Sequence, residues 1–435
     1  MNIENIYSIF EQCNFTVCTD TRKIIKDSLF IALKGELFNA NQFVEEAIRQ
    51  GCRYAIADEY QGQNEQVVVV DNVLKTLQEL AHYHRKQMKA KILGITGTNG
   101  KTTTKELIAA VLKEKYNIIY TQGNFNNHIG VPLTLLTIRP ETEIAIVEMG
   151  ANHPGEIDFL CSIAEPDYGI ITNVGKAHLE GFGSFEGVVK TKTELYRYIK
   201  TKNGLVFVNY DNKILLEHAM HLPNFSYGTN NLANIVATHF EAKPTLLLNW
   251  KMQNSSIVYT VNTHLIGKYN WENVLASIAI GSYFGLDPKA IIQGIENYIP
   301  TNHRSQWLTI GTNHILMDAY NANPTSMQLA LNNFVALPFE NKCLILGDMR
   351  ELGAYEENEH QTILNLLEQH SYKQVFLVGP VFTKLNKNKE FLTFNSVEHL
   401  MEYLKENKLA NSTILIKGSH GIHLEKLMNF FNEQV

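Results

Sequence analysis

The sequence predicts an α/β protein made of three consecutive domains. Apolar, strand-like runs alternate with segments of helical periodicity along nearly the whole chain. The 435 residues also exceed the roughly 100–200 residues that one domain usually contains. Polar segments at residues 86–91 and 299–305 interrupt the alternation. We therefore place the expected domain limits at 1–88, 89–303 and 304–435.

The N-terminal domain is predicted to be a small α/β module. The short apolar runs SLFIALKG, YAIAD and VVVVDN indicate strands. Between them, NQFVEEAIRQG places Phe43, Ala47 and Ile48 on one face of a helix. The polar segment KQMKAK then separates this module from the apolar run KILGITG.

The central domain is predicted to contain a parallel sheet. ILGI precedes the helix-periodic segment TKELIAAVLKEKY, and the runs EIAIVEMG, DYGIITNVG and GLVFVNYD are continuously apolar until they end in polar residues. Such runs are typical of parallel strands covered on both faces. The stretch from about 225 to 266 is β-rich and less regular, which predicts an antiparallel addition.

Strict alternation of strand and helix continues in the C-terminal domain. The runs HILMDAY, KCLILGD, QVFLVG and STILIKG alternate with the helical segments TSMQLALNNFVAL, ENEHQTILNLLEQH, SVEHLMEYLKEN and HLEKLMNFF. This order predicts a doubly wound, Rossmann-like domain.

Composition excludes several classes of protein. A net charge of -6 disfavours non-specific binding to nucleic acid or anionic membranes. No apolar run approaches the roughly 18 residues of a membrane span, and no basic residue precedes Arg22, unlike in a secretory signal. Five cysteines without a CxxC pair argue against a disulfide framework or a zinc site. We expect a cytoplasmic protein without membrane insertion or a nucleic-acid partner.

The segment GITGTNGKTTTKE lies between a predicted strand and a predicted helix, where a phosphate-binding loop belongs. Gly97 and Gly100 allow backbone N–H groups to turn inward around phosphate oxygens. Lys101 supplies a charge for the β- and γ-phosphates, and Thr102 offers a hydroxyl to Mg²⁺. Ile95 replaces the first glycine of the generic GxxxxGK[ST] pattern. The combination nevertheless disfavours an ordinary glycine-rich turn. The expected nucleotide contacts of the loop are Gly97, Thr98, Asn99, Gly100, Lys101, Thr102 and Thr103.

Two polar residues follow other strands of the predicted central sheet. Glu148 ends an apolar run, and His178 follows the next run by a few residues. Ligands of parallel sheets bind beyond the carboxyl ends of the strands, so Glu148 is a candidate Mg²⁺ ligand. Capping of a nearby helix is its alternative role. His178 is expected at the same sheet edge, although a lone histidine is as often simply packed or exposed.

Two further segments carry amide side chains. GNFNNHIGVPLT offers Asn126 and Asn127 near the nucleotide, or else it is only a turn before Pro132. In HLIGKYNWENVLASIAIG, Asn270 and Asn273 are one helical turn apart and suited to hydrogen-bond a base edge. Helix capping by Asn270 is the alternative that the residues alone favour.

Seven segments occur in the order and spacing of the Mur ligases: TGTNGKTTT, the strand ending in Glu148, NVGKAHLEGFGSFEGVVKTK, YNWENVLAS, NHRSQW, MDAYNANPTSM and LGDMRELG. The resemblance extends from about residue 19 to about residue 425. It implies the three-domain Mur ligase architecture, with an N-terminal domain for a UDP-sugar, a central P-loop ATPase domain and a C-terminal Rossmann-like domain. NFNNHIGVPLT and DAYNANP most resemble the members that act on UDP-MurNAc-tripeptide and D-Ala-D-Ala.

The resemblance implies an ATP- and Mg²⁺-dependent ligase of peptidoglycan precursor synthesis, and thus of cell shape and division, acting as a cytoplasmic monomer. ATP is expected to convert the terminal carboxylate of UDP-MurNAc-tripeptide to an acyl phosphate, which the amine of D-Ala-D-Ala attacks. The alternatives are a Mur ligase that adds a single amino acid or a folylpolyglutamate synthetase, and DAYNANP argues against both. A nucleotide-binding switch has no need of the additional substrate domain.

The resemblance also implies roles for individual residues. Its catalytic candidates are Lys101, His178 and Lys192. Thr102 and Glu148 are expected to bind a first Mg²⁺ and His178 a second. Lys192, fourteen positions after His178, matches a carbamylated lysine of related ligases, with Lys190 as the nearby competitor. Carbamylation converts a neutral amine into an anionic oxygen ligand.

The remaining candidates contact the nucleotide or the substrates. Asn273 and Arg304 match residues at the adenine nucleotide, and Asp318 falls where the third domain reaches the ribose. The candidate substrate contacts are Thr21, Arg22, Lys34, Gly35, Asn126, Asn127, Asn321 and Asn323. Asp348 and Leu352 are expected to shape the dipeptide end. In KGSHGIHLE, His420 occupies a position where the family more often has arginine.

Overall fold

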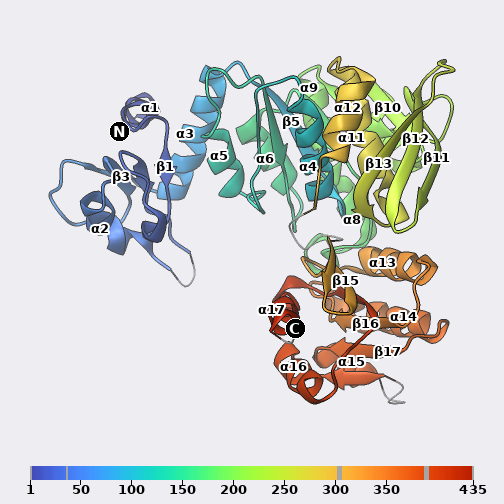
Figure 1. Cartoon of the computed structure of the whole chain (residues 1–435). Helices are drawn as coiled ribbons and strands as arrows, with labels where there is room; N and C mark the ends of the chain where they lie inside the picture. The colour runs from blue at the N-terminus through green and yellow to red at the C-terminus, as the bar shows by residue number, and fades with distance from the viewer. Residues whose placement is uncertain (1, 36–37, 301–305, 387–390, 434–435) are drawn as a thin grey trace.

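The computed structural model of the chain describes residues 2–35, 38–300, 306–386 and 391–433. Its strands form three separate sheets that follow one another along the chain (Figure 1). The α/β class predicted from the sequence is therefore confirmed. Within the described ranges, no helix is both long and apolar enough to cross a membrane.

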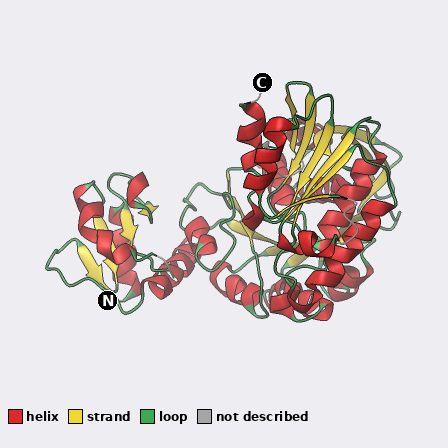
Figure 2. Cartoon of the chain, turned by 90° about the horizontal axis from the view of Figure 1, so that it is seen from below, coloured by secondary structure: helices red, strands yellow, loops and turns green. Residues whose placement is uncertain are grey.

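The N-terminal part is a small parallel sheet with three helices. Its elements are α1 (Ile3–Gln12), β1 (Val17–Cys18), β2 (Leu29–Ile31), α2 (Val44–Arg49), β3 (Tyr54–Ala57), β4 (Val67–Val69) and α3 (Val73–Gln87). Successive side chains of a strand point to opposite faces, so α1 and α3 cover one face and α2 the other. Figures 1 and 2 show this part standing to one side of the rest of the molecule.

The central part contains one sheet of nine strands. They are β5 (Lys91–Thr96), β6 (Ile118–Tyr120), β7 (Ile144–Glu148), β8 (Tyr168–Ile171), β9 (Leu205–Asn209), β10 (Asn224–Gly228), β11 (Ile235–Ala242), β12 (Thr245–Met252) and β13 (Tyr259–Ile266). The spatial order is β13-β12-β11-β10-β9-β8-β5-β7-β6. Antiparallel pairing occurs only between β11, β12 and β13. The expected antiparallel addition was thus wrong for β10, which pairs in parallel with both of its neighbours and so continues the parallel sheet.

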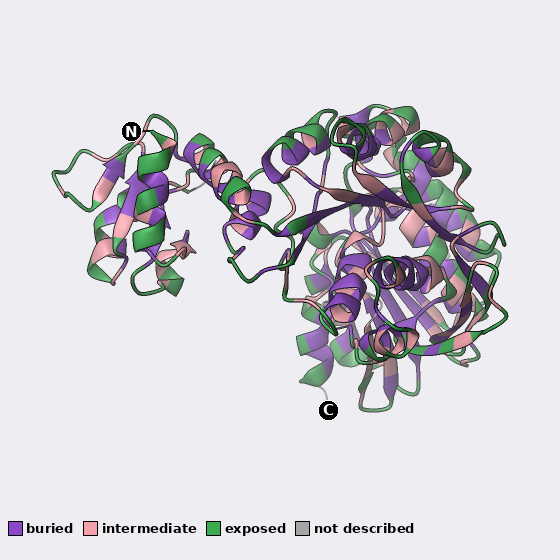
Figure 3. Cartoon of the chain, turned by 90° about the horizontal axis from the view of Figure 1, so that it is seen from above, coloured by how far each residue is buried: buried purple, intermediate pink, exposed green. Residues whose placement is uncertain are grey.

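Helices cover both faces of the central sheet. They are α4 (Lys101–Leu112), α5 (Gly130–Leu135), α6 (Glu156–Ala164), α7 (Leu179–Phe182), α8 (Phe185–Lys192), α9 (Glu194–Thr201), α10 (Lys213–Ala219), α11 (Trp271–Tyr283) and α12 (Pro288–Glu296). One face packs against α4, α11 and α12, and the other against α5, α6 and α9 together with α3. Figure 3 shows the strands of the larger sheets buried beneath these helices.

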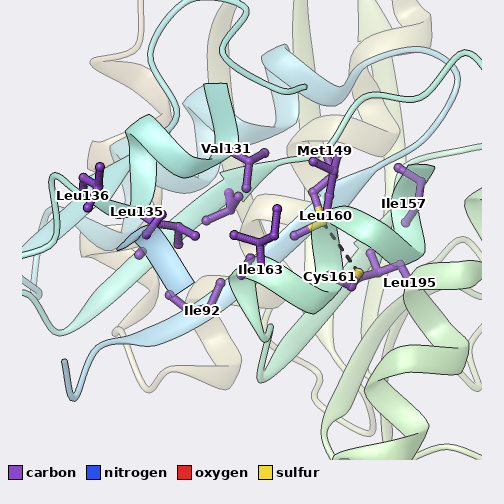
Figure 4. Packing of buried hydrophobic residues seen from close by; sticks show 14 of the residues in the cluster. Ile92, Val131, Leu135, Leu136, Met149, Ile157, Leu160, Cys161, Ile163 and Leu195 are labelled. Carbon is purple, nitrogen blue, oxygen red and sulfur yellow. Dashed lines mark hydrogen bonds between the residues drawn. The ribbon is translucent and has the colours of Figure 1, made fainter. Parts of the chain in front are cut away.

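Strand β7 illustrates why continuous apolar runs form this sheet. Ala145 and Val147 belong to the core under α5 and α6, whereas Ile144 and Ile146 belong to the core under α4 and α11. Figure 4 shows the first of these cores, in which Cys161 of α6 lies 3.8 Å from Met149, the residue after β7. Packing on both faces therefore holds the carboxyl end of β7 in place.

The C-terminal part is a doubly wound sheet of six strands. Its elements are β14 (Gln306–Ile310), β15 (Asn313–Asp318), α13 (Pro324–Ala336), β16 (Lys342–Gly347), α14 (Glu356–Glu368), β17 (Gln374–Val378), α15 (Pro380–Leu385), β18 (Leu392–Phe394), α16 (Val397–Glu406), β19 (Thr413–Lys417) and α17 (Lys426–Asn432). The order is β14-β15-β19-β16-β17-β18, and only β14 is antiparallel to its neighbour. The predicted Rossmann-like topology is confirmed.

In both larger sheets, the connections between successive strands reverse their direction across the sheet at a central strand. In the central sheet β5 lies between β7 and β8, and in the C-terminal sheet β19 lies between β15 and β16. Crevices for ligands form beyond the carboxyl ends of strands at such switch points. We therefore expect a ligand site at the loops after β5, β7, β15 and β16.

Candidate active site

Two glycines shape the loop between β5 and α4. Gly97 has a φ of +144°, and a Cβ there would lie 2.0 Å from Thr172 Oγ1. Gly100 has a φ of +77°, and a Cβ there would lie 2.6 Å from Asn273 Oδ1. No other residue type fits either position without strain. The resulting tight turn leads into the N-terminus of α4, where unpaired N–H groups and the helix dipole favour a phosphate.

The first two residues of α4 direct their polar groups to this loop and to β7. Lys101 Nζ donates hydrogen bonds to the carbonyl oxygens of Gly97 at 2.7 Å and Thr98 at 3.1 Å, so its side chain folds over the loop. Thr102 Oγ1 donates to Glu148 Oε2 at 3.0 Å. The structure thus brings together the hydroxyl and the carboxylate that the sequence assigned to one cation.

Glu148 is buried at the end of β7 and is surrounded by donors. Asn126 Nδ2 donates to its Oε1 at 2.9 Å. Lys105 Nζ lies 3.8 Å from Oε2 and donates to Thr121 O at 2.6 Å. Among the described residues its side-chain partners are therefore an amide, a hydroxyl and an ammonium, and none is a helix N–H group. Sequence reasoning missed Lys105, although it follows Lys101 by one helical turn on the same face of α4.

These residues fit a Mg²⁺ ion. Mg²⁺ prefers oxygen ligands, and the Thr102 hydroxyl and Glu148 carboxylate supply two of them side by side. Nowhere in the described parts of the chain do three His, Cys, Asp or Glu side chains gather into a metal site. Two protein oxygens suit Mg²⁺, which at nucleotide sites commonly keeps water and phosphate oxygens as its other ligands.

His178 lies at the junction with the C-terminal part. Its backbone has a φ of +49°, and its Nδ1 contacts the carboxylate of Glu351 in the loop after β16. The hydrogen bond from His178 holds the pKa of Glu351 below its usual range, although partial burial opposes this shift. The motif LGDMRELG contains Glu351, but this residue was not predicted as part of the site, because only the fold shows that its loop reaches His178.

Lys192 ends α8 inside the protein, whereas Lys190 on the same helix is exposed. Lys192 Nζ donates to Ala151 O at 3.3 Å and lies 5.3 Å from the centre of the Phe182 ring. Burial holds the pKa of its ammonium well below the usual range, and the charge of Lys101 lowers it further. Of the two candidate lysines, Lys192 is the buried one, and its surroundings favour a neutral amine.

Asn273 is buried where α11 approaches the phosphate loop. Its Oδ1 accepts a hydrogen bond from Thr104 Oγ1 at 3.0 Å, and its Nδ2 donates to Asn270 Oδ1 at 2.9 Å. Asn270 Nδ2 donates in turn to Ile266 O at 2.8 Å. Asn270 makes no side-chain capping bond, so the capping role favoured from the residues alone was wrong. It orients Asn273 instead.

Candidates from the C-terminal part face the same region. Lys417 Nζ donates to Asp318 Oδ2 at 2.6 Å, which joins the ends of the adjacent strands β19 and β15. Asn323 Nδ2 donates to Asn99 Oδ1 of the phosphate loop at 2.8 Å. Arg304 lies outside the described residues.

A cavity of about 660 Å³ lies where these groups meet. Most of the sequence-predicted nucleotide and peptide candidates line it, including Thr98, Asn99, Gly100, Lys101, Thr103, Asn126, Asn127, Glu148, His178, Asn273, Asp318, Asn321 and Asn323. Sequence reasoning missed its aromatic lining, to which Phe159, Tyr269, Trp271 and Tyr320 belong. The predicted residues thus come from both larger sheets and converge on one space.

The four N-terminal candidates do not line this cavity. Arg22, in a short turn with Thr21, pairs with Asp20 at 2.8 Å, and Lys34, next to Gly35, pairs with Glu59 at 2.5 Å. Asp348 and Leu352 do not line it either. Asp348 is buried and accepts hydrogen bonds from the N–H groups of Val381 and Phe382 at the start of α15, and Leu352 is part of the C-terminal core. Both residues stabilise the C-terminal part, and their expected role at the dipeptide end stays a prediction.

Two family domains match the chain. Residues 95–281 match the Mur ligase middle domain, and residues 303–420 match the Mur ligase, glutamate ligase domain. The chain is 36% identical over 433 residues to the UDP-N-acetylmuramoyl-tripeptide–D-alanyl-D-alanine ligase of Bacillus subtilis (strain 168), an alignment that covers 95% of this chain and 92% of the relative.

Solved structures agree with this relationship. MurF from Acinetobacter baumannii superposes with a TM-score of 0.85 at 29% identity, covering 96% of this chain and 93% of that one. The MurF ligase from Thermotoga maritima in complex with ADP superposes with a TM-score of 0.84 at 25% identity, covering 97% and 98%. The matched domains span more than half of the chain, and the relatives extend over nearly all of it. The chain therefore belongs to the Mur ligase family.

Proposed function

We propose that this protein is an ATP-dependent ligase that joins D-Ala-D-Ala to the terminal carboxylate of UDP-MurNAc-tripeptide. The observation that carries the proposal is the phosphate loop with Thr102 and Glu148 3.0 Å apart beside it, in a cavity completed by the C-terminal part. The near full-length relatives that bear the name of this activity support it over single amino-acid addition or folate glutamylation.

The proposed reaction has two steps, phosphorylation of the carboxylate and attack by the amine. An oxygen of the tripeptide carboxylate attacks the γ-phosphorus of ATP, and ADP leaves with the electrons of the broken P–O bond. The amine of D-Ala-D-Ala then attacks the acyl carbon, and phosphate leaves as the amine loses its proton. Activation is needed because a carboxylate is a poor electrophile, and enclosure prevents hydrolysis of the acyl phosphate by water.

The residues of the phosphate loop serve the first step. Lys101 turns from the carbonyls of Gly97 and Thr98 to the phosphate oxygens and stabilises the charge on the transferred group. Thr102 and Glu148 would hold Mg²⁺, which would neutralise phosphate charge. His178 is the candidate ligand of a second ion, and its bond to Glu351 orients the ring.

Lys192 is proposed to carry a carbamate. An amine reacts with CO₂ only in its neutral form, and burial favours that form at Lys192 but not at exposed Lys190. Lys192 also lies at Ala151, close behind the cavity wall. The carbamate adds an anionic oxygen next to the proposed cations.

The substrates are proposed to enter from different parts of the molecule. Asn273 and Arg304 contact the adenine nucleotide, and Asp318 contacts the ribose. Asn126, Asn127, Asn321 and Asn323 contact the peptide substrates, while Thr21, Arg22, Lys34 and Gly35 contact the uridine diphosphate. The three domains are proposed to be bounded near residues 88 and 303, and the enzyme to act as a cytoplasmic monomer.

Phosphate release over a panel of substrates tests the proposal. UDP-MurNAc-tripeptide plus D-Ala-D-Ala is expected to give the fastest release, and either substrate alone is expected to give little. A comparable rate with a single amino acid as acceptor, or with folate and glutamate as the pair, would overturn the proposal in favour of the corresponding alternative.

A further inference from the structure

A second cavity, of about 450 Å³, lies beside the first between the central and C-terminal parts. The residues that matter here are Thr102 and Asn124 on the central side and Tyr320, Arg350, Glu351 and His420 on the other. Asn124, Tyr320 and Asn321 line both cavities, so the two share a wall. Thr102, which contacts Glu148, places this second space next to the reacting groups.

Arg350 forms the cationic end of the second cavity. Its backbone N–H donates to Ser419 Oγ at 2.9 Å, which fixes the loop after β16 against the loop after β19. Its guanidinium packs over Gly421, where a Cβ would lie 2.8 Å from Nη1. Among the described residues this guanidinium is part of no ion pair within 4 Å, although its charge acts against the burial that raises the pKa of the Asp348 carboxyl. Arg350 is exposed and lines the cavity, so it presents a positive charge there.

His420 precedes Gly421, over which this guanidinium packs, and lines the same cavity. Its ring stacks against Tyr320 with centroids 6.4 Å apart and faces His423 at 5.8 Å. Arg350 reaches the same place from the neighbouring loop, because Gly421 directly follows His420 and leaves room for the guanidinium.

The opposite chemistry lies close by. Glu351 follows Arg350, and its carboxylate contacts His178, which lines the first cavity. A ligand that fills the second cavity therefore meets both the guanidinium of Arg350 and, at Thr102, the proposed phosphate and cation site. An amine acceptor that also bears a free carboxylate matches this arrangement.

We propose that Arg350 binds the free carboxylate of the acceptor dipeptide, with His420 beside it, and so aims the amine at the acyl phosphate. This assignment rests on the proposed function. The planar guanidinium suits a carboxylate because it donates two parallel hydrogen bonds. It makes Arg350 a residue that selects acceptors with a free carboxylate.

The test compares D-Ala-D-Ala with its C-terminal amide. Wild-type enzyme is expected to show a KM about 10- to 100-fold higher for the amide, as loss of a charged hydrogen-bonding partner predicts. Arg350→Ala should raise the KM for the acid by a similar factor, change that for the amide less than about 3-fold, and leave the KM for ATP unchanged. The control is Arg49→Ala, which changes an exposed arginine at the end of α2.

Two further variants separate binding from folding. Gly421→Ala keeps the charge but displaces the guanidinium, so it should also raise the KM for the acid selectively. His420→Arg in the Arg350→Ala background should restore discrimination by returning a guanidinium to the cavity. Equal effects of Arg350→Ala on acid and amide, or no effect on either, would overturn the assignment while leaving the ligase function intact. A wild-type enzyme that does not use D-Ala-D-Ala would overturn the proposed function and this assignment with it.

Discussion

Asn323 Nδ2 donates a hydrogen bond to Asn99 Oδ1 at 2.8 Å, which joins the C-terminal part directly to the phosphate loop. The same side chain caps α13, because its Oδ1 accepts from Ser326 N at 2.9 Å. Lys176 Nζ donates to Glu359 Oε1 at 2.8 Å, which adds to this bond and to the contact of His178 with Glu351 between the two parts. A nucleotide bound at the phosphate loop would therefore lie beside Asn99, whose side chain is bonded to the C-terminal part.

The two roles of Asn323 can be separated by substitution. Asn323→Ser retains a capping oxygen but is too short to reach Asn99, so stability should change by less than about 0.5 kcal/mol while kcat falls about tenfold. Asn323→Ala should lose the cap as well, at a cost of about 1 kcal/mol. Small-angle scattering with an ATP analogue and UDP-MurNAc-tripeptide should show a smaller radius of gyration for wild type and a weaker response for Asn323→Ser. This change is expected because the bound ligands would draw the C-terminal part toward the phosphate loop. An unchanged radius of gyration for wild type with both ligands bound would contradict that expectation.

Lys101→Ala is expected to abolish ligation while leaving the fold intact. Its Nζ donates hydrogen bonds to the carbonyl oxygens of Gly97 and Thr98, which holds a cation at the proposed phosphate site. Loss of such a preorganised charge commonly costs a factor of about 10²–10³ or more in rate. Phosphate release and circular dichroism measure the two effects, with exposed Lys89→Ala as the control. Near-normal turnover of a folded Lys101→Ala variant would remove the phosphate-loop assignment.

Lys192→Ala should lose most activity, and acetate or formate should restore part of it by supplying the missing carboxylate oxygens. Lys190→Ala is the matched control, because it removes an exposed lysine from the same helix and should have little effect. Mass spectrometry under bicarbonate should detect an added 44 Da, the mass of CO₂, on Lys192. An unmodified amine together with a fully active Lys192→Ala enzyme would rule out the carbamate.

Lys105→Met is expected to affect both stability and the response to Mg²⁺. The variant leaves Glu148 buried without the ammonium that lies 3.8 Å away, and breaking a buried charge pair in this way costs about 3–5 kcal/mol. A less firmly held carboxylate should also require more Mg²⁺ for half-maximal rate. Urea denaturation and a Mg²⁺ titration test these effects. The control is Lys113→Met, which changes an exposed lysine at the C-terminal end of α4. A wild-type Mg²⁺ response in the variant would show that Lys105 does not position Glu148.

Glu272 predicts a pH dependence of stability. Burial raises the pKa of its carboxyl from 4.5 to about 7, with the amide of Asn209 opposing the shift and Asp211 adding to it. Between these two pH values the folded state retains a proton that the unfolded state has lost, so the free energy of unfolding falls by about 3 kcal/mol as pH rises from 4.5 to 7. Glu272→Gln should remove this contribution and be the more stable protein at pH 8. Thermal unfolding at pH 5 and pH 8 tests this, and exposed Glu114→Gln should retain the wild-type dependence.

Sequence patterns alone identified the strands that lie inside the sheets. Strands such as β5 and β7 are buried on both faces, so their continuous apolar runs are visible in the sequence. The strands that went unpredicted were β1, β6, β14 and β18, and all four are edge strands. An edge strand pairs on one side only and tolerates polar or short segments, so it leaves a weak periodic signal.

The same division holds for the site. The phosphate loop, Glu148 and Asn273 could be found from the sequence because glycines, hydroxyls and amides occur there in short local patterns next to predicted strands and helices. Three other contacts could not be found in this way, because each joins segments that only the packing of sheets and helices brings together. They are the contacts of Glu351 with His178, of Lys105 with Glu148 and of Arg350 with Gly421. Local periodicity determines which elements form, whereas burial and the crossing of strands at a switch point decide which side chains meet.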